Sequence, residues 1–532
     1  MTAPEPRRPG GGRHAALVAA GILLSRVLGF VRERVFAHYF GNDTIPADAF
    51  RIALRIPNTI RNLLGEGTLS ASFIPVYAAL NEREDKGAAR AVAGATLGLV
   101  LAATGVLAVL GIAFAPAITA VIAAGFDEPR RALTVTLVRI LFPMTGLMVV
   151  SAWCLGILNT HRRFFLPYAA PALWNVAGIL AMIGGATWYV NRDLPVEAQL
   201  HQLALALAWG TVAGAVLQIA VQLPACWRIL RGIPVRVSLV PEGARDVVRA
   251  LIPVVVGAGA AQLSGLVDAL LSTLTGHGGT STLGYAQLVQ VLPVSLFGAS
   301  VNAVALPDLS REAVADGAHG LLRARVATGF RRIAFFVLPS ALAFILMGSV
   351  IAGAIFQTGR FEARDSALVG MVLAAYGFGL LGQASVKLFA SGFYALRDTR
   401  TPVTIAVSCL VLAGLSAFIL LRWLGPAGIA LGSSIGWTVS LVFHVRDLNA
   451  RIGRILHASD WRAFAVALGA ALAAGLAGAA VAHLARGAGA GPILLALGAF
   501  GMFGAVYGVL TLLFRHPDAL RLWHYLRNSP AR

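Results

Sequence analysis

Three arginines, Arg26, Arg32 and Arg61, lie in a stretch of the chain that is otherwise apolar enough to enter a lipid bilayer. An Arg at the centre of a membrane-spanning helix costs about 2.5–3.5 kcal/mol, so a chain keeps it only where it faces water, a partner charge or a ligand. The guanidinium stays charged when buried and binds phosphate oxygens through two parallel hydrogen bonds. We therefore predict that these three side chains face a cavity and bind a phosphate-bearing substrate.

Four acidic residues are expected to order these arginines or to gate the cavity. Glu33 follows the second arginine directly, and Asp48 begins the next apolar run. Glu66 lies in a Gly-rich break, and Asp268 lies within a later apolar run. In an alternative interpretation the arginines only pair with nearby acids inside one bundle of helices, or extend to the membrane interface, and bind no ligand.

The spacing of the charged residues sets what one helix can bring together. On an unbroken helix Arg26 and Glu33 share a face, whereas Arg32 points roughly 120° away. Gly29 lies between the two arginines and could let the helix bend or unwind. Such a bend would bring both guanidinium groups to one cavity.

The elements that position these side chains are predicted to be membrane-spanning helices. The chain of 532 residues is 58% hydrophobic and only 13% charged, with a mean hydropathy of +0.76. Apolar runs of about 20 residues recur along the whole sequence, which is typical of an all-α polytopic membrane protein. The net charge of +19 arises from arginines clustered in alternate loops, so it indicates membrane topology and not a nucleic-acid partner. This bias places both termini in the cytoplasm.

Several kinds of chemistry are excluded by absent motifs. Cys154, Cys226 and Cys409 are isolated in or beside apolar runs, and neither they nor the eleven His follow a metal-site spacing. No phosphate-binding loop of the form GxxxxGK[ST] is present, so the chain is not expected to hydrolyse ATP. We expect no enzyme activity and no cofactor.

About fourteen transmembrane helices are predicted, followed by a short polar tail. The segment 117–126 is too short to span the bilayer. The predicted spans are 16–40, 46–80 (interrupted by Pro57 and by Gly65–Gly67), 91–115, 132–158, 168–190, 203–226, 248–272, 282–306, 332–357, 366–393, 402–421, 425–445, 462–484 and 491–514.

An internal repeat relates two parts of the sequence. The turns GILNTHRRFFLP, ending at Pro167, and GFYALRDTRTP, ending at Pro402, are alike and lie about 235 residues apart. Asp268 follows Arg32 at the same interval, so we expect it to face the cavity from the opposite lobe. Six spans separate the copies, which predicts two parallel, pseudo-symmetric six-helix lobes around a central cavity, plus two C-terminal helices.

These patterns give the predicted domain boundaries. They are a disordered basic cytoplasmic tail (1–15), an N-lobe of spans one to six (16–230), a C-lobe of spans seven to twelve (231–445), spans thirteen and fourteen (446–514) and a cytoplasmic tail (515–532).

Long motifs in this sequence resemble one family of membrane transporters. They are SRVLGFVRE, ADAFRIALRIPNTIRNLLGEGTLSASFIPVY, YAQLVQVLPVSLFGASVNAVALPDLSR and KLFASGFYALRDTRTPV. The chain resembles the MurJ (MviN) family of lipid II flippases, of the multidrug/oligosaccharidyl-lipid/polysaccharide exporter superfamily. The resemblance implies fourteen helices, two lobes, and a groove formed by the last two helices that holds the undecaprenyl tail.

The resemblance also implies roles for particular residues. Those that bind the diphosphate-sugar head in the family match Arg26, Arg32 and Arg61, with acidic matches at Asp48 and Glu66. Two positions depart from the family pattern, because Leu288 and Ala269 stand where the family usually has Arg.

The leading hypothesis is therefore a lipid II flippase in the bacterial cytoplasmic (inner) membrane. It would move the peptidoglycan precursor from the inner to the outer leaflet by alternating access, driven by the membrane potential or an ion gradient. Expected partners are lipid II or a related polyprenyl-diphosphate glycan, membrane lipids and cell-wall synthesis proteins. The alternatives are a flippase for another polyprenyl-linked polysaccharide precursor and a membrane scaffold for cell-wall enzymes.

Overall fold

The computed structural model describes residues 11–190, 194–232, 235–298 and 318–528, and within these ranges helices are the only extended regular elements. Eleven of the described helical segments are long and apolar enough to cross a membrane, which confirms the all-α membrane class. The predicted spans 16–40, 248–272 and 282–306 are not among these eleven. The count of fourteen therefore stays a prediction.

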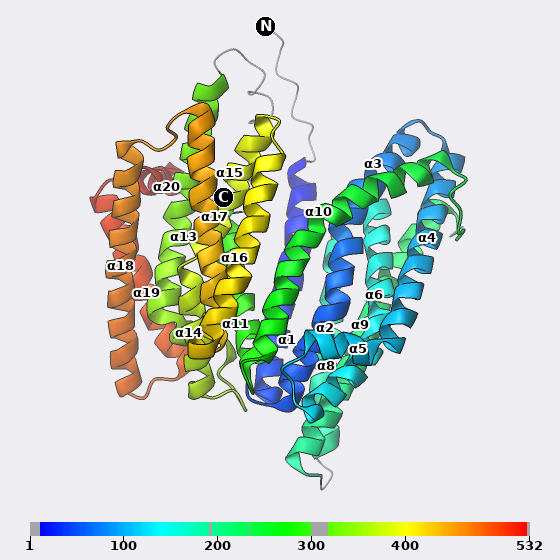
Figure 1. The fold of residues 1–532 in the computed structure, drawn as a ribbon, viewed down its shortest axis with the longest axis horizontal. Helices are drawn as coiled ribbons and strands as arrows, with labels where there is room; N and C mark the ends of the chain where they lie inside the picture. Colours follow the sequence, from blue (N-terminus) through cyan, green and yellow to red (C-terminus); the bar gives the residue numbers. More distant parts are fainter. Residues whose placement is uncertain (1–10, 191–193, 233–234, 299–317, 529–532) are drawn as a thin grey trace. The chain divides into compact units, whose positions relative to one another are not determined.

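The chain divides into two compact units, residues 1–278 and 279–532. The helix Glu242–Thr273, which contains the first predicted span of the C-lobe, lies in the first unit, beside helices of the predicted N-lobe (Figure 1). The lobe limits at residues 230 and 445 stay predictions.

The first unit contains ten helices in its described residues. They are coloured blue to green in Figure 1. They are α1 (Gly11–Phe40), α2 (Ile45–Leu64), α3 (Glu66–Glu82), α4 (Lys86–Ala113), α5 (Ala115–Ile122), α6 (Glu128–Thr160), α7 (Phe165–Ala169), α8 (Pro171–Val190), α9 (Val196–Leu230) and α10 (Glu242–Thr273).

The core of this unit forms around α6, the most buried of the eleven candidate spans. Phe73, Trp153 and Ile157 are fully buried in one apolar cluster with residues of α4 and α9. The indole nitrogen of Trp153 donates a hydrogen bond to the carbonyl oxygen of Ala93 at 3.0 Å, so this ring also satisfies its polar atom. This core holds the helices that carry the charged residues.

The predicted interruption at Gly65 is confirmed as the break between α2 and α3. A Cβ atom at this position would lie 2.3 Å from the carbonyl oxygen of Arg61, so only glycine fits here. Pro57 does not end its helix, because α2 continues through it to Leu64. At the other end of α2, the side chain of Thr44 accepts a hydrogen bond from the Ala47 amide and caps the helix.

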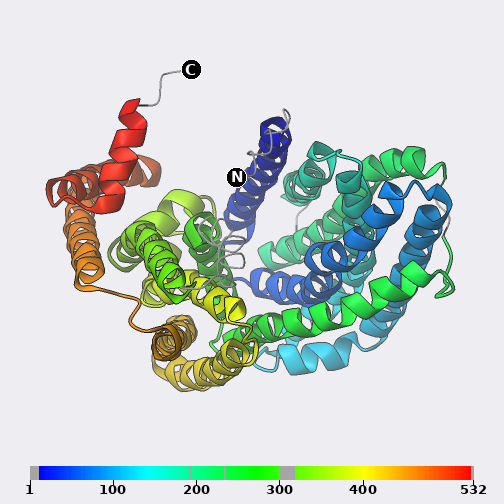
Figure 2. The same cartoon turned by 90° about the horizontal axis from the view of Figure 1, so that it is seen from above.

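The second unit contains a short π-helical segment and nine α-helices in its described residues. Figures 1 and 2 show them from two directions. They are α11 (Gly279–Pro293), the π-helical η1 (Val294–Gly298), α13 (Ala318–Phe356), α14 (Ala363–Gly377), α15 (Leu380–Ala395), α16 (Arg400–Leu424), α17 (Pro426–Ile452), α18 (Ala458–Gly487), α19 (Pro492–Leu513) and α20 (Pro517–Asn528). The predicted span 366–393 is built from two helices, α14 and α15, and the end of the predicted span 282–306 lies outside the described residues.

The two turns of the predicted repeat have the same backbone geometry. Arg162 and Arg397, which lie about 235 residues apart, have φ angles of 58° and 59°. In each turn the next residue, Arg163 or Asp398, donates its amide to a carbonyl five residues back, at 2.8 and 2.9 Å. The same left-handed ending occurs at Arg231 and Arg515, where Gly232 and His516 donate to carbonyls five residues back. The shared geometry is therefore not specific to the two turns, and the repeat stays a prediction.

Candidate functional site

The helix that carries Arg26 and Arg32 is continuous. α1 runs from Gly11 to Phe40 without a break at Gly29, and it packs against α7 and α8. The side-chain amide of Asn175 donates a hydrogen bond to the carbonyl oxygen of Ser25 at 3.2 Å and fixes this part of α1 against α8.

Arg32, Glu33 and Arg51 form an ion cluster between α1 and α2. The Arg32 guanidinium lies 2.7 Å from one carboxylate oxygen of Glu33, and the Arg51 guanidinium lies 3.2 Å from the other. The side chains are 18%, 13% and 15% exposed, respectively. Because two cations share one anion, the cluster carries an excess of one positive charge.

Aromatic rings support both guanidinium groups. The Arg32 guanidinium lies 4.4 Å from the centre of the Trp174 ring, and that of Arg51 lies 5.0 Å from the Phe36 ring. Such cation–π contacts hold a charged group on an apolar surface. A small cavity adjoins the cluster and is lined by Arg32, Glu33, Phe36, Phe50, Arg51, Leu54, Met182, Leu207 and Thr211.

The other two predicted binding arginines are apart from this cluster. Arg26 is exposed on α1, as expected for a residue about 120° from Arg32 on a continuous helix. Arg61 is half-buried near the end of α2, with its guanidinium 3.4 Å from the side-chain oxygen of Asn62. That these arginines bind one ligand together with Arg32 stays a prediction.

α10 is attached to α2 close to Arg61. The amide of Asn62 donates a hydrogen bond to the side chain of Gln262 at 3.3 Å. One helical turn further along α10, the carbonyl oxygen of Gly265 accepts a hydrogen bond from the Arg55 guanidinium at 2.9 Å. Asp268, predicted to face the cavity from the opposite lobe, is half-buried on the same helix in the first unit. Its role as a gating residue stays a prediction.

Asp48 is a buried anchor at the start of α2. Its carboxylate lies 3.5 Å from the guanidinium of Arg130 on α6 and accepts a hydrogen bond from the amide of Gly278 at 2.9 Å. The same guanidinium donates to the carbonyl oxygen of Gly276 at 3.2 Å and also bonds Asp127. This arrangement joins α2, α6 and the turn after α10. The predicted ordering or gating role of Asp48 is untested.

Glu66 is the first residue of α3, directly after the break at Gly65. Its side chain lies outside the described residues, so its predicted role stays a prediction.

Sequence reasoning did not single out Arg51 and Arg130. Arg130 precedes the predicted span 132–158 by two residues, which made it similar to an ordinary interfacial residue. Arg51 follows Glu33 by 18 residues, and nothing in that spacing indicates contact between the two helices. One signal was present, because Arg51 is a charged residue within the apolar run 46–80.

Charged and aromatic side chains make up the described part of the site. Within the described ranges, no group of three or more His, Cys, Asp or Glu side chains could hold a metal ion. Cys154, Cys226 and Cys409 are buried free thiols.

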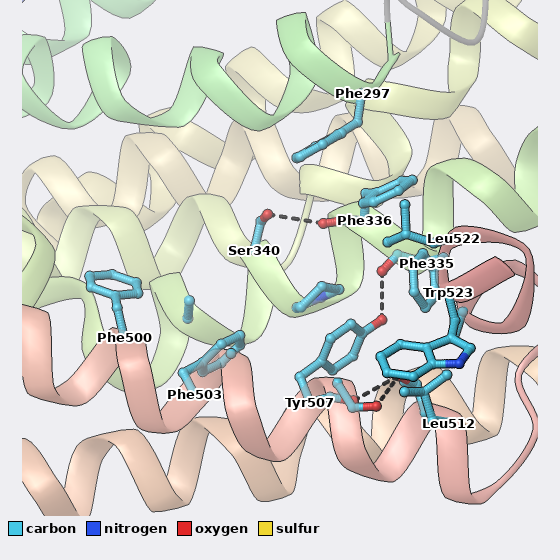
Figure 3. Close-up of a pocket in the computed structure, with 16 residues that line it drawn as sticks. Phe297, Phe335, Phe336, Ser340, Phe500, Phe503, Tyr507, Leu512, Leu522 and Trp523 are labelled. Carbon is cyan, nitrogen blue, oxygen red and sulfur yellow. Dashed lines mark hydrogen bonds between the residues drawn. The ribbon is translucent and has the colours of Figure 1, made fainter. Parts of the chain in front are cut away.

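The second unit contains a separate, aromatic cavity of about 410 Å³ (Figure 3). Its walls come from η1, α13, α19 and α20, and include Phe336, Tyr507 and Trp523. The Tyr507 hydroxyl donates to the carbonyl oxygen of Phe335 at 2.6 Å, so the ring meets the cavity with its polar atom satisfied. The other residues that line it are Phe297, Phe335, Pro339, Ser340, Ala343, Phe500, Phe503, Gly504, Gly508, Thr511, Leu512, Ala519 and Leu522.

An ion network fastens α20 beside this cavity. The Arg331 guanidinium lies 3.1 Å from Asp460, at the start of α18, and 3.1 Å from Asp518, at the start of α20. Both carboxylates stand in the first turn of their helices, where the helix dipole favours negative charge. This network fixes the end of the cavity that α20 covers.

The sequence and the fold match one group of known proteins. Residues 36–499 match the family model described as lipid II flippase MurJ. The chain is 34% identical over 466 residues to the lipid II flippase MurJ of Burkholderia cenocepacia, covering 86% of this chain and 88% of that protein. It is 31% identical over 436 residues to the probable lipid II flippase MurJ of Rhizobium meliloti, covering 80% and 78%.

Solved structures share the fold. A lipid II flippase MurJ in an inward closed conformation matches with a TM-score of 0.74 and 22% identity, covering 94% of this chain and 99% of that one. An inward-facing multidrug resistance MATE transporter of the MOP superfamily matches with a TM-score of 0.61 and 16% identity, covering 82% and 98%. The family model and the curated relatives each extend over most of the sequence, so the chain belongs to the MurJ family of lipid II flippases.

Proposed function

We propose that this chain moves lipid II, the undecaprenyl-diphosphate-linked peptidoglycan precursor, from the inner to the outer leaflet of the bacterial cytoplasmic membrane. Curated relatives that match most of its length are named lipid II flippases, and that activity is carried over here. The movement supplies precursor for cell-wall synthesis. Both chain termini lie in the cytoplasm in this proposal, as the distribution of arginines predicts.

The ion cluster of Arg32, Glu33 and Arg51 is the observation that carries the proposal. It places an excess positive charge among apolar helices, with both guanidinium groups mostly buried. Such a group attracts an anion strongly, because water screens the charge poorly there. A diphosphate supplies the oxygens that guanidinium groups bind in pairs. Arg26 and Arg61 add positive charge on the same two helices.

The aromatic cavity of the second unit is proposed as part of the site for the polyprenyl tail. The resemblance placed this groove at residues 446–514, and α19 from that region forms one wall of the cavity. α13 and α20 form other walls. An apolar cavity of this size suits an isoprenoid chain, because each buried CH₂ contributes roughly 0.8 kcal/mol.

The energy for transport is proposed to come from the membrane potential or an ion gradient. Moving one elementary charge through 100 mV corresponds to about 2.3 kcal/mol, and the diphosphate head is anionic. A potential that is negative inside therefore favours outward movement of the head. The fold shared with MATE transporters supports alternating access as the way the head crosses the membrane.

Replacing the binding arginines tests this proposal in cells. Arg26→Ala and Arg32→Ala should each abolish complementation of a strain depleted of its own lipid II flippase, because the diphosphate loses its cationic partner. The matched control is Arg131→Ala, which removes a half-buried arginine from the first turn of α6 and should support growth. Membrane levels of each variant are measured in parallel, and full growth with a normally expressed Arg32→Ala would refute the proposal.

A second candidate is a flippase for another polyprenyl-linked polysaccharide precursor. It is favoured by Leu288 and Ala269, which stand where the family usually has Arg. Ala269 is buried in an apolar cluster with Ile52, Ala123 and Phe126, a surrounding that offers no place for a charged side chain. Native mass spectrometry of the purified protein with lipid II and with other polyprenyl-diphosphate sugars separates the two functions. Preferential binding of lipid II excludes the second candidate.

A further inference from the structure

The carboxylate of Glu33 lies between two guanidinium groups and engages each with a different oxygen. Arg32 donates to Oε1 at 2.7 Å, and Arg51 donates to Oε2 at 3.2 Å. This is the pattern in which two arginines hold a phosphate, with the carboxylate of the protein itself in the place of the anion. The two cations come from different helices, so their separation is set by the packing of α1 and α2.

The adjoining cavity is small and has mostly apolar walls. It offers about 30 Å³, room for one or two water molecules. Leu54, Met182 and Leu207 are among the apolar residues that line it. A phosphate group is larger than this space, so it fits only if the Glu33 carboxylate moves away from the guanidinium groups.

Both guanidinium groups keep their support when the carboxylate leaves. Arg32 rests on the ring of Trp174 and Arg51 on the ring of Phe36, and neither contact involves Glu33. The cations therefore stay in place for an incoming anion, and little side-chain entropy is lost on binding.

We propose that the space between Arg32 and Arg51 is a subsite for one phosphate of the substrate, with Arg51 as a binding residue and Glu33 as its internal substitute. This inference rests on the proposed function, in which the substrate carries a polyprenyl diphosphate. Without substrate the carboxylate bonds both cations and offsets one of their two charges, and the phosphate replaces it.

Binding to the purified full-length protein tests this assignment, with undecaprenyl diphosphate as the probe. Arg51→Gln should weaken binding roughly ten- to a hundredfold, because a charge-assisted contact to phosphate is lost. Glu33→Gln should strengthen binding, because the competing anion is gone. Unchanged affinity for Arg51→Gln, or weaker binding for Glu33→Gln, would overturn the proposal. Arg55→Gln, one turn further along α2 and outside the cavity lining, gives the baseline for an arginine lost from this helix.

A double variant separates phosphate binding from a purely structural role. Glu33→Gln with Arg51→Gln removes both partners of one ion pair, which relieves the cost of leaving either charge alone. If Arg51 binds phosphate, the double variant binds the probe less tightly than Glu33→Gln alone. If it binds as tightly as Glu33→Gln alone, Arg51 only joins two helices and the proposal is wrong.

Arg32→Gln distinguishes failure of this inference from failure of the proposed function. If Arg32→Gln weakens binding and Arg51→Gln does not, only the role of Arg51 is refuted. If neither variant changes the affinity, the diphosphate does not bind at this cluster, and the proposed function loses the observation that carries it.

Discussion

At the scale of single residues, the first unit buries charged side chains among its apolar helices. Two clusters share helix α2, with Arg51 in one and Asp48 in the other. The cluster at Arg51 has an excess of positive charge and adjoins a cavity. At Asp48 the guanidinium of Arg130 and a backbone amide surround the carboxylate. The arrangement at Arg51 suits ligand binding, and the arrangement at Asp48 suits a fixed connection between helices.

Removing the cation from the connection at Asp48 should destabilise the protein strongly. Arg130 and Asp48 are 5% and 1% exposed, so Arg130→Met leaves a buried carboxylate without its cation. We expect the free energy of unfolding to fall by about 3–5 kcal/mol. The measurement is the fraction of protein still folded after heating in detergent, which should be smaller for this variant. Arg131→Met, at a side chain that is 37% exposed, should be nearly neutral.

Adding Asp48→Asn to Arg130→Met should recover much of that loss, because no charge is then left buried alone. A double variant as unstable as Arg130→Met would show that the guanidinium acts through its other hydrogen bonds, to Gly276 and Asp127.

We predict that His161 makes the protein less stable in acid. Burial lowers the pKa of this side chain below its ordinary value of 6.5, and the charge of Arg163 lowers it further. As the pH falls, the unfolded chain therefore protonates His161 before the folded protein does. The contribution of the neutral side chain to stability is present above about pH 6.5 and declines below it. His161→Gln should flatten the decline between pH 7.5 and 5.5 in thermal unfolding. An unchanged pH profile in this variant would contradict the assignment.

At the scale of elements, the break between α2 and α3 sets where Arg61 lies. Gly65→Ala places a Cβ atom 2.3 Å from the carbonyl oxygen of Arg61, so the backbone must shift. We expect a loss of about 1–3 kcal/mol in stability and reduced complementation. Gly67→Ala is the matched control, because a Cβ atom there meets no atom within 4 Å. Equal losses for the two substitutions would show that the contact with Arg61 does not explain the result, because Ala in place of Gly67 should favour helix α3.

Several elements could be predicted from the sequence because their signals are local. The end of α1 at Phe40 and the break at Gly65 agree with the apolar pattern and the glycine spacing. The repeat predicted from two turn sequences stays a prediction, because the φ angles of Arg162 and Arg397 are close to those of Arg231 and Arg515. The contact of Arg32 with Glu33 joins sequence neighbours.

Other features depend on contacts between distant segments, which periodicity does not reveal. Arg130 meets Asp48 from 82 residues away, and Arg55 meets the backbone of Gly265 from 210 residues away. The same holds for α10, whose place in the first unit follows from its packing on α2 and α3 and not from its own composition. The repeat predicts that the corresponding span, 248–272, belongs to the C-lobe, and this lobe limit stays a prediction.

At the scale of the whole molecule, the sequence family, the helical fold and the charged cluster point to one activity. Family membership rests on a match over residues 36–499. The proposed head-group site rests on Arg32 and Arg51 around Glu33, and the proposed tail site rests on the aromatic cavity beside α20. The charged cluster and the aromatic cavity together predict that the anionic head and the apolar tail of the substrate bind to separate surfaces of one protein.

Transport of lipid II in reconstituted liposomes is the most direct test of this account. Liposomes that contain the full-length protein and fluorescent lipid II should transfer the head group between leaflets, measured by its accessibility to an added reagent that cannot cross the membrane. The account predicts rapid transfer with the unmodified protein and transfer no faster than in protein-free liposomes with Arg32→Ala. Equal rates for these two proteins, or no transfer with the unmodified protein, would contradict it.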